Sequence, residues 1–359
     1  MKTALIHLLL GAMVAGGSIA TAVADDDRRT ADGRPDFSGT YNVATLTPLQ
    51  RPAALGETLI LSPEEARRIA AEERRLLAEG LEPSDPNRSA PPRGGDGSTG
   101  AAGNVGGYNT FWIDRGDGAI MIDGNYRTSI MTSPGNGRFP GLVPEAQKVM
   151  MERRRLFREN TGEAWWLEHE GPGPYDDPEL RPLGERCLLG FGSTAGPPML
   201  PVLYNNIKRI IQTPDTVVIV TEMNHDARIV RMNAKHAPPD QRFWLGDSIG
   251  WWEGDTLVID TTNFRDQTGL SGGTRDLHVE ERFRRATDGT LLYSFTVRDP
   301  NVWVEPWSGE YPWPETDDLM FEYACHEGNY ALGGILRGAR LLEAEARQTA
   351  AEAEGRGAP

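Results

Sequence analysis

The chain has 359 residues, 38% of them hydrophobic, and a formal net charge of -15 at pH 7. This length suits one large domain or two, with enough residues for a sizeable core. A chain this acidic lacks the positive surface that binds nucleic acid or anionic membranes, so neither is an expected partner.

The first 24 residues have the pattern of a secretory signal peptide. Lys2 precedes an apolar run from Ala4 to Met13, and small residues then lead to Ala22-Val23-Ala24. The run is too short to span a bilayer, and no later segment approaches the ~20 apolar residues that a span needs. We therefore expect cleavage after Ala24 and a periplasmic or secreted protein without membrane insertion.

Two peripheral helices are predicted before the central strands. Ser62-Pro63-Glu64-Glu65 combines a cap residue, a proline at the first helical position and a glutamate three residues after the cap. This pattern predicts a helix over residues 62–80. A second helix is predicted over residues 144–160, and its latter half is rich in arginine.

A long loop over residues 82–107, rich in Pro, Gly and Ser, separates these helices. It is interpreted either as a linker or as a binding loop. Glycines stand beside Tyr108 and Asn109 at its end and permit close approach of the backbone to a ligand. A strand is predicted next, over residues 110–114.

The second half of the chain consists of β-branched and aromatic runs separated by turn residues. The predicted strands include residues 217–223, 228–231, 248–252, 256–262, 278–283, 291–297 and 319–325. The pattern predicts a mainly β fold, an antiparallel meander that closes into a lipocalin-like barrel with peripheral helices and long loops. One domain is expected over residues 25–340, followed by a helical or disordered tail over residues 341–359.

The sequence contains two cysteines, Cys187 and Cys325. In an exported protein a disulfide is the expected state, and it would join the middle of the chain to its C-terminal part. Closing so long a loop stabilises by about 4–5 kcal/mol in the chain-entropy model. The alternative is two buried free thiols.

Several motifs carry a resemblance to known proteins. Pro35-Asp36-Phe37-Ser38-Gly39-Thr40-Tyr41 resembles the opening of lipocalin-like barrels, where Gly-x-aromatic begins the first strand. From Asp36 to about Arg340 the chain is similar to a broad group of exported, mostly uncharacterised bacterial proteins. The shared motifs are Tyr108-Asn109-Thr110-Phe111-Trp112, Glu185-Arg186-Cys187, Glu222-x-x-His225, Gly246-Asp247-Ser248, Trp252-Glu253-Gly254-Asp255-Thr256-Leu257 and Cys325-His326-Glu327-Gly328-Asn329. The resemblance implies a shared fold with varied chemistry.

The densest group of ionisable residues surrounds one predicted hairpin turn. Glu222-x-x-His225 enters the turn, and Arg228 and Arg231 follow on the return strand. This pattern indicates an acid/base site in which His225 moves a proton, Glu222 orients it and an arginine holds a developing anion. The alternative is a polar hairpin tip whose charges pair in water.

A second group lies on the strand that begins at His278. His278, Glu280 and Arg282 share one face by the period-two rule, which is typical of a solvated surface. Glu281 then falls on the apolar face, where we expect it to pair with an interior arginine. Tyr108 or His278 is the candidate acid that would complement His225.

Aromatic and amide side chains are the candidates for binding a ring-bearing substrate. They are Asn109, Trp112, Tyr204, Asn205, Trp244 and Trp252. Packing in the core is the alternative use of such aromatic residues.

These features favour an exported lyase or isomerase that needs no cofactor and no metal. Its substrate would be a small ring-bearing molecule, such as a lignin-derived aromatic or a sugar derivative. One alternative is a periplasmic carrier protein of lipocalin type. Another is a metal-dependent hydrolase in which His225 and His278 bind the metal. The sequence makes no prediction about the oligomeric state.

Overall fold

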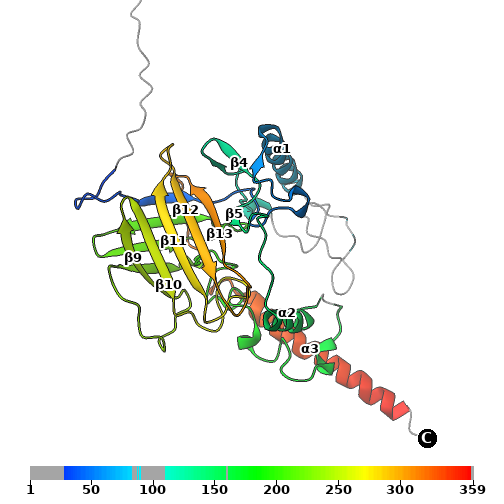
Figure 1. Ribbon diagram of the computed structural model, residues 1–359. Helices are drawn as coiled ribbons and strands as arrows, with labels where there is room; N and C mark the ends of the chain where they lie inside the picture. Colours follow the sequence, from blue (N-terminus) through cyan, green and yellow to red (C-terminus); the bar gives the residue numbers. More distant parts are fainter. Residues whose placement is uncertain (1–27, 83–86, 88, 90–109, 159–160, 357–359) are drawn as a thin grey trace, which may run out of the picture.

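The structure is a computed structural model that describes residues 28–82, 87, 89, 110–158 and 161–356 (Figure 1). The predicted signal peptide and the candidate residues Tyr108 and Asn109 lie outside the described residues. Among the helices in the described part of the chain, none has both the length and the apolar character to cross a membrane.

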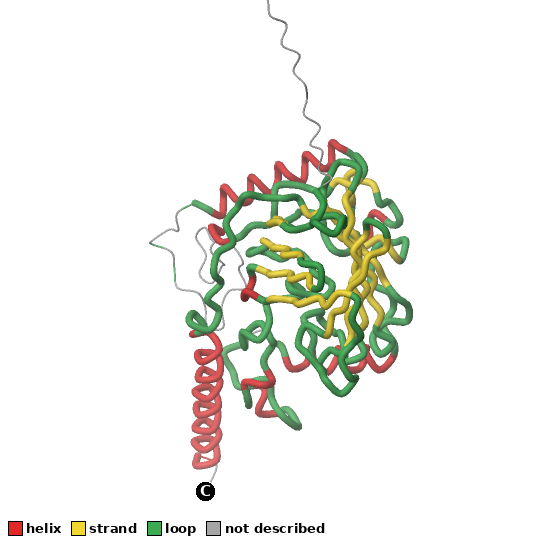
Figure 2. The backbone as a smooth tube through the Cα atoms, turned by 90° about the vertical axis from the view of Figure 1, so that its left-hand side faces the viewer, coloured by secondary structure: helices red, strands yellow, loops and turns green. Residues whose placement is uncertain are grey.

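The protein is mainly β and is built on a ten-stranded sheet that curls into a half-barrel (Figures 1 and 2). The strand order is β1-β6-β7-β8-β9-β10-β11-β12-β13-β5. The strands are β1 Gly39–Asn42, β5 Met131–Ser133, β6 Ile207–Gln212, β7 Thr216–Thr221, β8 Ala227–Met232, β9 Asp247–Glu253, β10 Thr256–Thr262, β11 His278–Arg285, β12 Leu291–Arg298 and β13 Trp307–Trp313. A separate three-stranded sheet has the order β2-β4-β3, with β2 Ile60–Leu61, β3 Met121–Ile122 and β4 Asn125–Arg127.

Alternation of buried and exposed residues orients the long strands. In β11 and β13 every second side chain is buried, so one face of the sheet packs on the core and the other meets solvent. Aromatic rings fill the inner face: Phe283, Tyr293 and Trp313 are fully buried, with ring centroids 4.9 to 5.2 Å apart. The interior of the curl is therefore a packed core.

The edge strand β1 lies beside the chain that follows β13. The Asn42 N–H donates to the Pro314 carbonyl at 3.1 Å, and the Thr316 N–H donates to the Thr40 carbonyl at 2.9 Å. These bonds bring the first strand of the chain next to its last strand at one end of the sheet.

The helices lie outside the sheet. They are α1 Pro63–Gly80, α2 Pro144–Leu156 and α3 Tyr330–Arg356, with short 3-10 turns η1 Ala53–Leu55, η2 Thr110–Trp112, η3 Trp165–Glu168, η4 Pro178–Leu180 and η5 Met223–His225. The predicted start of α1 is confirmed, because the Ser62 hydroxyl accepts from the Glu65 N–H at 3.1 Å. α2 ends at Leu156 and not at residue 160. α3 begins before the predicted tail, so the expected boundary at residue 340 falls inside a helix that extends away from the sheet (Figures 1 and 2).

Three predictions about strands are wrong. Residues 110–114 contain the turn η2 and no strand. Residues 319–325 have the strand pattern but pair with nothing, because β13 already pairs with β12 and β5. The meander is interrupted between β8 and β9, which pair in parallel after the excursion over residues 233–246.

Candidate functional site

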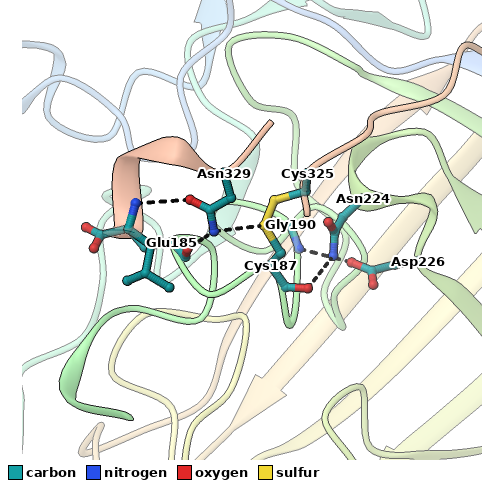
Figure 3. The surroundings of a disulfide bond; sticks show 8 residues. Glu185, Cys187, Gly190, Asn224, Asp226, Cys325 and Asn329 are labelled. Carbon is teal, nitrogen blue, oxygen red and sulfur yellow. Dashed lines mark hydrogen bonds between the residues drawn. A yellow bond between two sulfur atoms is a disulfide. The ribbon is translucent and has the colours of Figure 1, made fainter. Parts of the chain in front are cut away.

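The predicted disulfide between Cys187 and Cys325 is confirmed, and it lies at the centre of the candidate site (Figure 3). On one side of it the Asn329 side-chain amide donates to the Glu185 carbonyl at 2.7 Å and contacts the Cys187 sulfur at 3.4 Å. On the other side the Asn224 amide donates to the Cys187 carbonyl at 3.3 Å. Three of the shared sequence motifs, far apart in the chain, therefore meet here.

The hairpin between β7 and β8 ends in a tight turn, η5. Asn224 and His225 both have positive φ, at 61° and 40°, a conformation that asparagine tolerates better than histidine. The turn leaves the His225 side chain exposed to solvent. Because a strained residue at a hairpin tip is held by its surroundings, the hydrogen bond from Asn224 to the Cys187 carbonyl helps to fix the position of His225.

Glu222 holds two backbone segments together. Its carboxylate is 5% exposed; Oε1 accepts from the Phe321 N–H at 3.0 Å and Oε2 from the Ile207 N–H at 3.4 Å. The side chain therefore ties the start of β6 to the C-terminal segment of the chain. The sequence suggested that Glu222 orients His225 directly, whereas its two carboxylate oxygens bind these two amides.

Asp226 and Lys208 lie next to this turn and have shifted pKa values. Burial raises the pKa of Asp226 to about 6, although hydrogen bonding from the Gly190 N–H at 3.0 Å and the charge of Lys208 oppose the shift. Burial lowers the pKa of the fully buried Lys208 to about 7, against the attraction of Asp226 and Glu222. The Lys208 ammonium donates to the Thr194 carbonyl at 2.8 Å. Groups with pKa values near neutrality are suited to proton transfer.

The two pKa changes predict opposite effects of pH on stability. The pKa of Asp226 is raised on folding, so its stabilising contribution is complete below the unfolded pKa of about 3.9 and is lost as the pH rises through about 6. The pKa of Lys208 is lowered, so its contribution is complete above about 10.4 and is lost as the pH falls through about 7. A tenfold change in proton affinity on folding corresponds to about 1.4 kcal/mol of stability.

Urea unfolding at a series of pH values checks the predicted contributions of Asp226 and Lys208 to stability. We expect Asp226→Asn to flatten the fall in the free energy of unfolding between about pH 4 and 6. We expect Lys208→Met to flatten the rise between about pH 7 and 10. Unchanged slopes in both variants would contradict the altered pKa values of these two groups.

Arg228 lies behind the turn in a buried ion pair. It is 3% exposed, and its guanidinium Nη1 lies 2.8 Å from Oε2 of Glu281, which is fully buried. The Tyr293 hydroxyl donates to Glu281 Oε1 at 2.7 Å, and burial keeps the pKa of Tyr293 well above its usual value. The expected pairing of Glu281 with an interior arginine is confirmed. Because Arg228 is that arginine, its guanidinium lies in the core.

Arg231 and His278 belong to a different network, on the outward face of the sheet. Arg231 Nη2 lies 2.8 Å from Asp247 Oδ1, and Asp247 Oδ2 lies 3.0 Å from His236 Nδ1. His236 Nε2 then lies 2.8 Å from Asp260 Oδ2, and Asp260 Oδ1 contacts His278 Nε2. These two candidate residues are thus joined to each other through Asp247, His236 and Asp260, which the sequence did not single out as a network. The sequence did contain a signal for this network, since Asp247 and Asp260 fall on adjacent strands.

The carboxylates of this outer network stay ionised. Burial would raise the pKa of Asp260, but hydrogen bonds from His278 and His236 outweigh it and lower the pKa. The same balance lowers the pKa of Asp247, where the Ala237 N–H, His236 and Arg231 are the donors. The two ring nitrogens of His236 each lie within hydrogen-bond distance of a carboxylate, Nδ1 of Asp247 and Nε2 of Asp260. The network is an ionic link between strands and is separate from the hairpin turn.

Two of the candidate substrate-binding residues lie on the loop that leads to Glu222. Tyr204 and Asn205 lie shortly before β6, and Tyr204 stacks on Tyr323 with ring centroids 6.3 Å apart. The neighbouring Asn206, 2% exposed, donates to the Asp114 carbonyl at 3.0 Å. This bond fixes the loop against the segment that follows η2.

Trp112 lies in η2, near this loop, and is 62% exposed, with its ring edge-on to Phe111 at 5.1 Å. The remaining two tryptophans lie elsewhere. Trp252 packs against Phe37 at 5.5 Å beside the core, and the Arg265 guanidinium covers the Trp244 ring at 4.6 Å. The hydrogen bonds of Asp114 place the end of η2 beside the loop that carries Tyr204 and Asn205, whereas Trp244 and Trp252 lie on other segments.

No protein-family model matches the chain, and no curated protein is significantly similar to it. Within the described ranges, no group of three or more His, Cys, Asp or Glu is arranged to hold a metal ion.

Proposed function

We propose that the protein is an exported, cofactor-free lyase or isomerase that moves a proton on a small ring-bearing molecule at the β7–β8 turn. His225 is the base, and Asp226 is the second proton-transferring group. Proton removal and return require only a base and an acid held near one substrate atom. Lignin-derived aromatics and sugar derivatives are the proposed substrate classes.

The observation that carries this proposal is the pairing of an exposed imidazole with a carboxyl group whose pKa is near neutral. His225 is exposed, and burial raises the pKa of the adjacent Asp226 to about 6. A carboxyl with such a pKa is able both to donate and to accept a proton at physiological pH. Glu222 and the disulfide position the turn, and Arg231 and His278 have no role in it because their network lies on the outward face.

Export and a lipocalin-like closure of the sheet are part of the same proposal. The disulfide supports export, because such bonds persist in oxidising compartments. The hydrogen bonds between β1 and the chain after β13 support closure at one end of the curl. A carrier of lipocalin type is the alternative function, but the rings of Tyr293, Phe283 and Trp313 fill the space in which a lipocalin holds its ligand.

The test is turnover of a panel of lignin-derived aromatics and sugar derivatives by the mature chain from Asp25. We expect His225→Ala and Asp226→Asn each to lower kcat by a factor of about 10² to 10⁴, the usual contribution of one acid or base. His278→Ala is the matched control: it removes the same side chain on the outward face and should leave kcat unchanged.

Equal loss in the control and in His225→Ala would refute the assignment of the site. Retention of panel compounds without turnover by the wild-type chain would favour the carrier. Circular dichroism of each variant separates loss of activity from loss of fold.

A further inference from the structure

A groove of about 500 Å³ lies between α1 and the loops that approach it from the sheet (α1 is labelled in Figure 1). One wall is the helix, with Ile69 as its apolar contribution. The opposite walls are residues 45–49, which follow β1, and residues 200–203, which lead towards β6. Elements from three parts of the chain therefore form this groove.

The groove is largely apolar inside and charged at the rim. Its apolar lining consists of Leu46, Pro48, Leu49, Ile69, Leu200, Pro201, Val202 and Leu203. The charged lining residues Arg68 and Glu72 are held in ion pairs along α1, with Glu65 and Arg75. Grooves of this size and composition are typical of sites for small molecules.

Arg115 is the rim residue best suited to fix the orientation of a bound molecule. One nitrogen of its guanidinium lies 3.4 Å from a carboxylate oxygen of Glu73, and its side chain is 41% exposed. A guanidinium has five N–H donors in a planar fork that fits a carboxylate with two parallel hydrogen bonds. A long contact to Glu73 leaves donors for such a group.

The groove and the proposed proton-transfer site are connected by one short loop. The Val202 N–H, in the groove wall, donates to the Asn206 side-chain oxygen at 2.9 Å. The next residue, Ile207, donates its N–H to Glu222. Tyr204 and Asn205 lie between these two points, so the segment that lines the groove continues directly into the site.

We propose that this groove binds a small apolar molecule that carries an aromatic ring and one anionic oxygen group, which Arg115 binds. The ring lies against the apolar walls between α1 and residues 200–203. The bound molecule would be the substrate of the β7–β8 turn, and this link to catalysis rests on the proposed function. The groove itself is testable without any turnover.

Anilinonaphthalene sulfonate is a suitable probe, because it combines aromatic rings with one anionic group. Calorimetric titration of the mature protein is expected to show one site. Ile69→Trp fills the groove from an exposed helix, and Arg115→Glu reverses the rim charge; we expect each to weaken binding at least ~10-fold, a change of about 1.4 kcal/mol. Arg275→Glu makes the same charge reversal at a surface arginine outside the groove lining and should change the Kd less than twofold.

Absence of binding, or a Kd that neither groove variant changes, would overturn the proposal. If the uncharged phenylnaphthylamine binds as tightly as the anionic probe, and Arg115→Glu has no effect, the claim that Arg115 binds an anionic group is refuted. Asp226→Asn should bind the probe like the wild-type protein. If the protein does not bind the probe in the groove but its turnover still depends on His225, only the groove proposal is refuted. If the groove binds the probe but turnover does not depend on His225, only the proton-transfer proposal is refuted.

Discussion

Arg228→Met is expected to lower the free energy of unfolding by about 3–5 kcal/mol, because it leaves the Glu281 carboxylate charged and unpaired in the core. Arg228 and Glu281 are 3% and 0% exposed, so water cannot replace the lost partner. The Tyr293 hydroxyl would still donate to Glu281, but one neutral donor does not balance a buried charge. Guanidinium unfolding of the purified variant measures the loss.

The double variant Arg228→Met with Glu281→Leu is the informative control. It removes both charges together, and replacing a buried pair by apolar residues is often neutral or stabilising. We expect it to recover most of the stability that the single variant loses. Equal stability losses in the single and double variants would show that the side chains matter through packing rather than through charge.

Removal of the disulfide is expected to have a comparable effect. Cys187 and Cys325 are 138 residues apart, and opening a loop of that length costs about 4–5 kcal/mol in the chain-entropy model. Guanidinium unfolding of the Cys187→Ser, Cys325→Ser double variant, without reductant, measures the loss. The wild-type protein in excess dithiothreitol should approach the same midpoint.

A second readout locates the effect of the disulfide. The segment over residues 317–329 belongs to no strand. It is tied to the body by the disulfide, by the hydrogen bonds from Phe321 to Glu222 and from Asn329 to the Glu185 carbonyl, and by the stacking of Tyr323 on Tyr204. Faster hydrogen exchange at the Phe321 amide in the double variant would show that the segment loosens. A stability loss below about 1 kcal/mol with unchanged exchange would contradict both the magnitude and the role.

The fold was predictable wherever local pattern decides structure. Alternation placed His278 and Glu281 on opposite faces, and the cap at Ser62 fixed the start of α1. The local sequence pattern gave wrong predictions where the pairing of distant strands determines the structure. Residues 319–325 are apolar and aromatic like a strand, but β13 is already paired on both sides, with β12 and β5. The parallel pairing of β8 with β9 depends on how the excursion over residues 233–246 returns, which no local signal encodes.

The candidate site was predictable in part. Glu222 and His225 are three residues apart in the sequence, and both lie at the turn beside the disulfide. Arg231 is three residues after Arg228 in the same strand, an odd spacing that places the two side chains on opposite faces of the sheet, where they enter different networks. Residue spacing predicts on which face of the sheet a side chain lies, but not which residue from another segment it contacts. His236 was therefore missed, although it links Asp247 and Asp260.

The position of β1 has a consequence for folding during synthesis. This strand is among the first to leave the ribosome, but it pairs with β6 and with the chain after β13. Its partners on both sides are thus made much later, and contacts between such distant residues form slowly. The nascent chain must keep its first strand unpaired until its C-terminal part is available, which makes a holding chaperone useful at that stage.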